Sequence, residues 1–186
     1  MNIARLNDIA NRFESMADGK SSSGFIARDR YGRSVVVTNR RVVTFADAVT
    51  IILTWKGDSE VALSMEHCRI LYEDPDIDFA LVQLPEGAFE ETPRLELAES
   101  IPADGETVWA AGYPSLSGVR TWRLGEGQVI NRSIFVDRMG SEQFAVFTEH
   151  SASIDDESSG GPLLMGNPDE PSTMRVVGLN SWGIPG

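Results

Sequence analysis

Cysteine and histidine are scarce in this chain. Its 186 residues include one cysteine, Cys68, and two histidines, His67 and His150. A single cysteine cannot form an intrachain disulfide, which separates the chain from the disulfide-rich secreted proteins. Three such side chains are also fewer than the four ligands of a usual structural zinc site. We therefore expect neither a disulfide framework nor zinc.

Positive charge and long apolar runs are lacking as well. Sixteen Lys and Arg residues against 28 Asp and Glu residues give a formal net charge of −12. This charge repels a phosphate backbone and an anionic membrane surface, so neither nucleic acid nor a membrane is expected as a partner. Residues 1–20 lack the apolar segment of a signal peptide, and no later run is long enough to span a bilayer. The sequence favours a cytoplasmic location over export by a signal already removed.

The amino-terminal segment has the spacing of a helix, and a run rich in glycine and serine follows it at 18–24. We therefore expect residues 1–20 to form an amphipathic helix and linker that packs against the rest of the chain. A helix that docks a partner is the alternative. Its apolar side would consist of Ile3, Leu6, Ala10, Phe13 and Ala17.

Two groups of short β-rich runs follow, with turn residues between them and a linker rich in proline and acid at 85–102. Hairpin turns are expected at 29–32 and 56–58. Two such groups predict an all-β fold of two small antiparallel barrels, at 21–100 and 101–186. The expected strands are 24–27, 34–39, 50–55, 61–65 and 79–84, then 107–111, 124–134, 143–148, 162–164 and 174–181.

Five short motifs occur along these runs in a definite order. They are Ser-Gly-Phe-Ile-Ala at 23–27, Val-Val-Thr-Asn-Arg-Arg-Val-Val at 36–43, Asp-Ile-Asp-Phe-Ala-Leu-Val at 76–82, Gly-Tyr-Pro at 112–114 and Ser-Ser-Gly-Gly-Pro-Leu at 158–163. In order and spacing they resemble the trypsin-like serine proteases, and most of all the bacterial Deg-type (high-temperature-requirement) branch. The resemblance covers residues 23–183 and implies two six-stranded-type β-barrels in one trypsin-like domain.

The resemblance implies a catalytic triad with one member replaced. Ser159 matches the nucleophile and Asp78 matches the buried carboxylate, but Arg41 stands where the family has its histidine. That histidine must accept the serine proton and return it to the leaving amine. A guanidinium stays protonated and does neither, so we expect Arg41 to form an ion pair with Asp78 instead.

The resemblance also implies a damaged oxyanion site. In the family, the amides of the nucleophile and of a glycine two residues earlier bind the developing negative charge; here they belong to Ser159 and Glu157. The carboxylate of Glu157, beside Asp155 and Asp156, opposes negative charge on a substrate. Loss of one such donor costs on the order of 10²- to 10³-fold in rate. A calcium or magnesium site at the three acids is the alternative to a solvated loop or a pairing with Arg41, but no metal or other cofactor is expected.

The edge that holds a substrate keeps its family residues. Ser181, Trp182 and Gly183 resemble the segment that pairs with a bound peptide and walls the primary specificity pocket, and Ser153 matches the pocket floor. A small neutral floor does not select a basic side chain. A peptide can therefore add as a strand here without being cut. Ordinary barrel packing explains Trp182 equally well.

These features predict a trypsin-like protease homologue without peptidase activity that binds or scaffolds a peptide or protein. The alternative is an active serine endopeptidase whose base is relocated, as to His150, or supplied by a partner, although His67 and His150 are expected as packing or pocket-lining residues. A third reading is a domain kept for assembly. Since the family continues after residue 183 through a strand and usually a helix, we expect an open edge in the second barrel. Further chain, the N-terminal helix or a partner subunit would cover that edge.

Overall fold

The computed structural model describes residues 11–15, 21–44, 49–55, 59–63, 68–87, 94–113, 115–116, 119–120, 122–136, 145–154 and 158–181. Strands dominate this part of the chain. The helical pieces are α1, Arg40–Val43, and the short 3-10 helix η3, Pro171–Thr173. None of the described helices has the length and apolar character needed to cross a bilayer.

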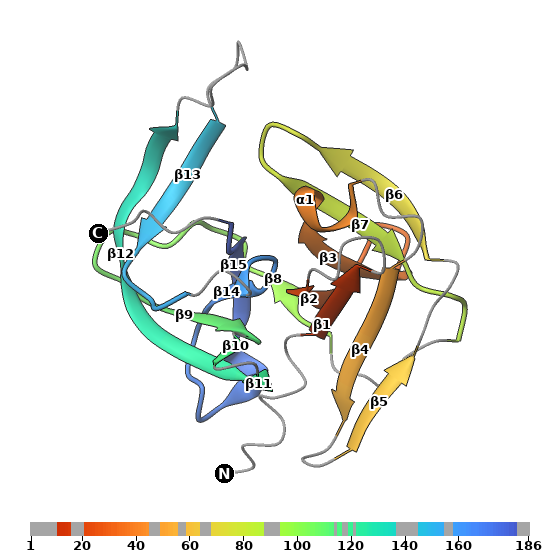
Figure 1. Ribbon diagram of the computed structural model, residues 1–186. Coiled ribbons are helices and arrows are strands. Elements are labelled where there is room, and N and C mark those ends of the chain that lie inside the picture. The colour runs from red at the N-terminus through yellow and green to blue at the C-terminus, as the bar shows by residue number, and fades with distance from the viewer. Residues whose placement is uncertain are drawn as a thin grey trace.

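The first lobe, at the right of Figure 1, is a seven-stranded sheet whose neighbouring strands are all antiparallel. Its strand order is β5-β4-β1-β2-β3-β7-β6. The β2–β3 hairpin turns where Asp29 Oδ1 accepts hydrogen bonds from the amides of Tyr31 and Arg33, and Gly32 supplies a φ of 78°. The strands are β1 Asn11–Ser15, β2 Ser21–Arg28, β3 Ser34–Asn39, β4 Val49–Trp55, β5 Ser59–Leu63, β6 Arg69–Asp74 and β7 Phe79–Gln83.

The second lobe, at the left of Figure 1, is a six-stranded sheet in the order β13-β12-β9-β14-β15-β8. Only the short β8 runs parallel to its neighbour, β15. The long β12 pairs with β9 through its first half and with β13 through its second half. A separate ribbon joins β10 Ser115–Leu116 and β11 Val119–Arg120. The other strands are β8 Glu96–Leu97, β9 Thr107–Gly112, β12 Arg123–Val136, β13 Ala145–His150, β14 Pro162–Met165 and β15 Arg175–Leu179.

The predicted all-β architecture with two groups of strands is confirmed. Strand 34–39 was predicted with its observed bounds, and the other predicted strands overlap an observed strand. In neither sheet, however, does the strand order return to its first strand within the described ranges, so the two closed barrels are not confirmed. The predicted turn at 56–58 lies outside the described residues.

The helix predicted for residues 1–20 is wrong at residues 11–15, which form β1. This strand lies between β2 and β4, with Asn11 opposite Gly24 and Arg12 opposite Ile52. A strand in that place makes ladder hydrogen bonds on both sides, and this tertiary gain outweighs a helical spacing of apolar residues. The rest of the predicted helix lies outside the described residues. The linker 85–102 contains β8, which joins the second sheet ahead of the expected boundary at residue 100.

Three clusters of buried apolar side chains hold the molecule together. One lies within each lobe, and the central cluster takes side chains from both lobes. In the central cluster, Leu164 of β14 is fully buried with Phe25 of β2 and Val35 of β3. Because this cluster is shared, each sheet buries part of its apolar surface against the other lobe. Its buried members are Phe25, Ala27, Val35, Val37, Ala111, Tyr113, Leu164, Met174 and Val176.

A substitution of Leu164 by alanine tests this shared core. The cavity left in the central cluster should lower the free energy of unfolding by about 2–5 kcal/mol. The two lobes should still unfold together, with one urea transition by circular dichroism and by tryptophan fluorescence, since Trp109 and Trp122 pack against the cluster. Leu97→Ala is the control because Leu97 is 64% exposed, and it should have little effect. Two separate transitions in the unsubstituted protein would contradict the shared core.

Candidate functional site

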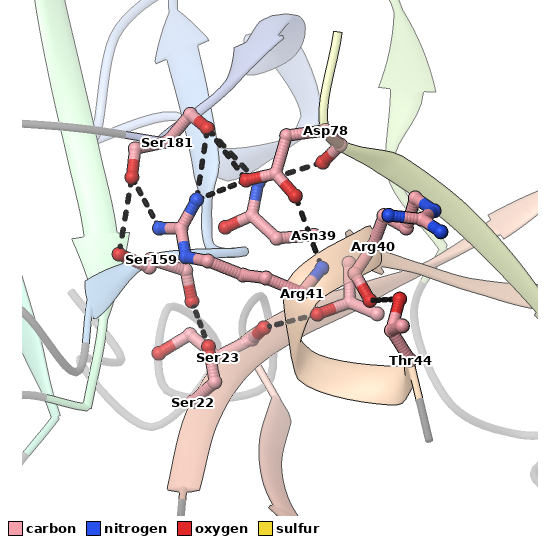
Figure 2. A network of polar contacts seen from close by, with 10 residues as sticks. Ser22, Ser23, Asn39, Arg40, Arg41, Thr44, Asp78, Ser159 and Ser181 are labelled. Atoms are coloured by element: carbon pink, nitrogen blue, oxygen red, sulfur yellow. Dashed lines mark hydrogen bonds and ion pairs between the residues drawn. The ribbon is translucent and has the colours of Figure 1, made fainter. Parts of the chain in front are cut away.

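The structure brings four of the predicted site residues together where the two lobes meet. Arg41 lies on α1 and Asp78 in the turn before β7, both in the first lobe, while Ser159 lies in the loop before β14. Ser181 lies two residues after the end of β15 and contacts the other three residues. Figure 2 shows the four side chains converging on one small region.

The backbone at Asp78 is held in an unusual conformation. Its φ of 53° lies in the left-handed region, which non-glycine residues rarely adopt. The carbonyl of Asp78 accepts hydrogen bonds from the Arg40 amide, at 3.0 Å, and from Asn39 Nδ2, at 3.1 Å. Asn39 is fully buried at the end of β3. The end of β3 and the start of α1 therefore fix the turn that carries Asp78, and such strain persists only where its surroundings demand it.

The ion pair expected between Arg41 and Asp78 is present. The Arg41 amide donates to Asp78 Oδ1 at 3.0 Å, and Arg41 Nη1 donates to Asp78 Oδ2. The Asp78 side chain is 6% exposed, whereas the Arg41 side chain is 38% exposed. A carboxylate buried to this degree needs a compensating charge or donors, and here it has both.

Ser181 extends this pair into the second lobe. Its hydroxyl donates to Asp78 Oδ2 at 3.0 Å and accepts from Arg41 Nη1 at 3.2 Å. Its carbonyl accepts hydrogen bonds from Arg41 Nη2 and, at 3.3 Å, from Ser159 Oγ (Figure 2). The guanidinium thus links the first lobe to the second, and the Ser159 hydroxyl lies at the edge of the same network.

The loop at Ser159 is shaped by close backbone contacts. The Ser159 carbonyl accepts from the Ser23 amide, at 2.8 Å, and from Ser22 Oγ. Gly160 has a φ of 86°, and a Cβ there would lie 2.1 Å from the Ser23 carbonyl oxygen. Only glycine fits this position, which explains the Ser-Gly-Gly sequence physically. Within the described part of the chain the Ser159 amide has no acceptor, whereas the Gly160 amide donates to the Asn180 carbonyl at 2.8 Å.

His150 does not contact Ser159. It ends β13, opposite Val129, and no hydrogen bond joins the two described side chains; Ser159 Oγ donates to the Ser181 carbonyl instead. Burial lowers the pKa of the His150 imidazole below its ordinary value, although the Asn180 side chain and the Ala152 backbone oppose the shift. Its Nδ1 is buried without a hydrogen-bond partner in the described structure. The ring is therefore neutral at neutral pH and positioned as a lining residue.

An apolar cavity of about 1230 Å³ extends from this site between the lobes. Strands β2, β3 and β7 line one side, and β12, β13 and β15 line the other. Ser153, the predicted pocket floor, and Ser181 both line this cavity, together with His150. The sequence did not predict the apolar lining residues Ile130, Ile134 and Phe147. Periodicity does not show that β12 and β13 of the second lobe face strands of the first lobe across a cavity.

Several predicted positions lie outside the described residues: Glu157 with its neighbours Asp155 and Asp156, His67, Trp182 and Gly183. Among the residues that are described, no group of three acidic, histidine or cysteine side chains is placed to hold a metal ion. Sequence reasoning missed Asn39, whose amide binds both Asp78 and Ser181. The only signal was a polar residue that ends a buried strand just before Arg40 and Arg41.

The family follows from comparison with known proteins. A family model described as trypsin-like peptidase domain matches residues 22–179, and the chain belongs to this family. It is 27% identical over 165 residues to "Serine protease Do-like HtrA" of Bacillus subtilis. The matched segment covers 88% of this chain and 34% of that protein. The chain thus spans about a third of the length of that relative.

Solved structures share the fold at low identity. The MamO protease domain from Magnetospirillum magneticum has a TM-score of 0.68 at 16% identity, covering 96% of this chain and 86% of its own. A serine endoprotease from Yersinia pestis has a TM-score of 0.64 at 19% identity, covering 96% of this chain and 54% of its own. Membership of this family gives the chain the fold of serine hydrolases. The chemistry of the site depends on the residues that this chain itself carries.

A double-mutant cycle tests whether Arg41 and Asp78 act as one unit. Arg41→Gln leaves the buried carboxylate without its charge partner, and Asp78→Asn removes that need. The coupling free energy in urea denaturation should be about 1–3 kcal/mol. The control is the more exposed pair Arg40 and Glu73, whose Nε and Oε2 atoms are 3.5 Å apart. Arg40→Gln with Glu73→Gln should couple by less than about 1 kcal/mol. Equal coupling in the two cycles would contradict this account.

The lowered pKa of His150 gives a pH prediction. The unfolded chain binds a proton near pH 6.5 while the folded ring stays neutral to lower pH, so stability should fall as pH drops through this value. His150→Gln should flatten this part of the stability curve measured by urea denaturation between pH 7 and about 5. Nuclear magnetic resonance should show a folded midpoint below 6.5, and a midpoint above it would contradict the burial argument.

Proposed function

We propose that this chain is a trypsin-like protease homologue without peptidase activity that binds an extended peptide or protein segment. One observation carries the loss of activity: Arg41, at the family's histidine position, is ion-paired to Asp78. A serine attacks a carbonyl only when a base takes its proton. A guanidinium cannot take one, because it stays protonated at physiological pH.

The surroundings of Ser159 support this proposal. The hydroxyl donates a hydrogen bond of 3.3 Å to the Ser181 carbonyl, which is no proton acceptor for catalysis. The family's second oxyanion donor would belong to Glu157, whose carboxylate opposes developing negative charge. The missing base at position 41 and the acidic residue at position 157 are independent defects, and together they lower the expected activity more than either alone.

The binding role rests on features that do not need proton transfer. Ser181 lies two residues after the end of β15, and the sequence there continues with Trp182 and Gly183, which resemble the family's peptide-pairing segment, so an extended segment can add at this place. The cavity beside this edge offers apolar walls, and Ser153 offers a neutral polar group. A neutral or apolar side chain suits this lining better than a basic one.

The competing function is an active endopeptidase with another base. The lowered pKa of His150 favours it, because a neutral imidazole is a competent base. A movement of β13 or of the Ser159 loop would be needed, since no hydrogen bond joins the two side chains and Ser159 Oγ donates to the Ser181 carbonyl. A base supplied by a partner would also serve.

A fluorophosphonate probe separates these functions. The unsubstituted protein should show no labelling at Ser159, because the hydroxyl is not activated. Arg41→His combined with Glu157→Gly should recover labelling, and each change alone should recover little. Arg40→His with Glu157→Gly is the matched control, since Arg40 lies beside the site and pairs with Glu73. Labelling of the unsubstituted protein that disappears in His150→Ala would overturn the proposal and identify the relocated base.

A further inference from the structure

One edge of the Arg41 guanidinium is unused in the described structure. Nη1 donates to Asp78 Oδ2 and Ser181 Oγ, and Nη2 donates to the Ser181 carbonyl. The Nε hydrogen and the second Nη2 hydrogen have no acceptor among the described residues. These two N–H groups lie on the same edge of the planar group, the arrangement that binds a carboxylate through two parallel hydrogen bonds.

The Ser159 hydroxyl stands next to this edge. Arg41 Nη2 and Ser159 Oγ both donate to the same carbonyl oxygen, that of Ser181, so the two donors are close neighbours (Figure 2). The Ser159 hydrogen bond is 3.3 Å long, which is weak, and the hydroxyl can turn toward a better acceptor. The Arg41 side chain is 38% exposed, so a ligand can reach it.

The charges favour a single carboxylate over a larger anion. Asp78 already compensates one face of the guanidinium from a buried position, and a second monoanion on the other edge gives arginine two carboxylate partners. Asp78, the Glu157 carboxylate two residues before Ser159 in the sequence, and the net charge of −12 repel any anion, and they repel a phosphate dianion more strongly than a single carboxylate. The ligand group is therefore planar, monoanionic and bidentate.

The place of this edge indicates where in a peptide the carboxylate belongs. If a peptide lies along β15 as proposed above, its main chain passes Ser159, and the Ser159 hydroxyl faces a main-chain group. A carboxylate at that point is then the end of the main chain, and the last side chain enters the cavity near Ser153. We propose that the Arg41 edge and the Ser159 hydroxyl bind the free α-carboxylate of a peptide's C-terminal residue. This inference rests on the proposed peptide-binding function.

The test compares fluorescein-labelled peptides rich in alanine and valine by fluorescence anisotropy. One ends in alanine with a free α-carboxylate, the second is its C-terminal amide, and the third is an amide whose last residue is glutamate. The free acid should bind roughly tenfold to a hundredfold more tightly than either amide, because charge-assisted hydrogen bonds are lost in the amides. Equal binding by the glutamyl amide would assign the site to side-chain carboxylates and overturn the inference.

Variants locate the effect. Arg41→Gln should remove most of the difference in affinity between the free acid and the amide, and Arg41→Lys should restore only part of that difference because lysine lacks the planar fork. Arg40→Gln is the control and should bind like the unsubstituted protein, and circular dichroism should confirm that each variant is folded. If acid and amide bind the unsubstituted protein equally, this inference fails while the binding function stands. If neither binds at any concentration, the proposed function fails as well.

Discussion

The contact between the Arg41 guanidinium and the buried Asp78 carboxylate is the constraint on which the site depends. Asp78 is 6% exposed in its side chain, in a turn with φ of 53°, and an uncompensated charge there would be costly. The same carboxylate that would orient an imidazole in an active relative here holds a permanent cation. Because that cation also reaches both polar groups of Ser181, the charge compensation joins the two lobes at their polar junction.

The backbone contacts that hold the Ser159 loop do not involve the side chain at position 41. The Ser159 loop is held by the Ser23 amide and by the packing that requires glycine at 160, and the Gly160 amide binds the Asn180 carbonyl. These are backbone interactions in which the guanidinium takes no part. An ion pair at position 41 therefore leaves the backbone contacts of this loop in place.

What could be predicted from the sequence was whatever depends on neighbours in the chain or on motif order. A run of valines between turn residues predicted the strand 34–39. The order of two motifs predicted the Arg41–Asp78 pair. Strand β1 could not be predicted, since its partners β2 and β4 come later in the chain and the local spacing favours a helix. Asn39 was missed for a similar reason, because its two partners lie 39 and 142 residues away.

The overall charge and the local charge of this molecule act in opposite directions on a ligand. A net charge of −12 repels an acidic peptide at a distance and slows its approach, while the open edge of Arg41 attracts a carboxylate at close range. Long-range repulsion is screened beyond about 8–10 Å at physiological ionic strength, whereas a half-buried fork is screened much less. A peptide suited both to the long-range repulsion of anions and to the short-range attraction of Arg41 has neutral or basic residues along its length. It carries a single negative group where it meets Arg41. The chain end of such a peptide is the one place where every sequence carries that group.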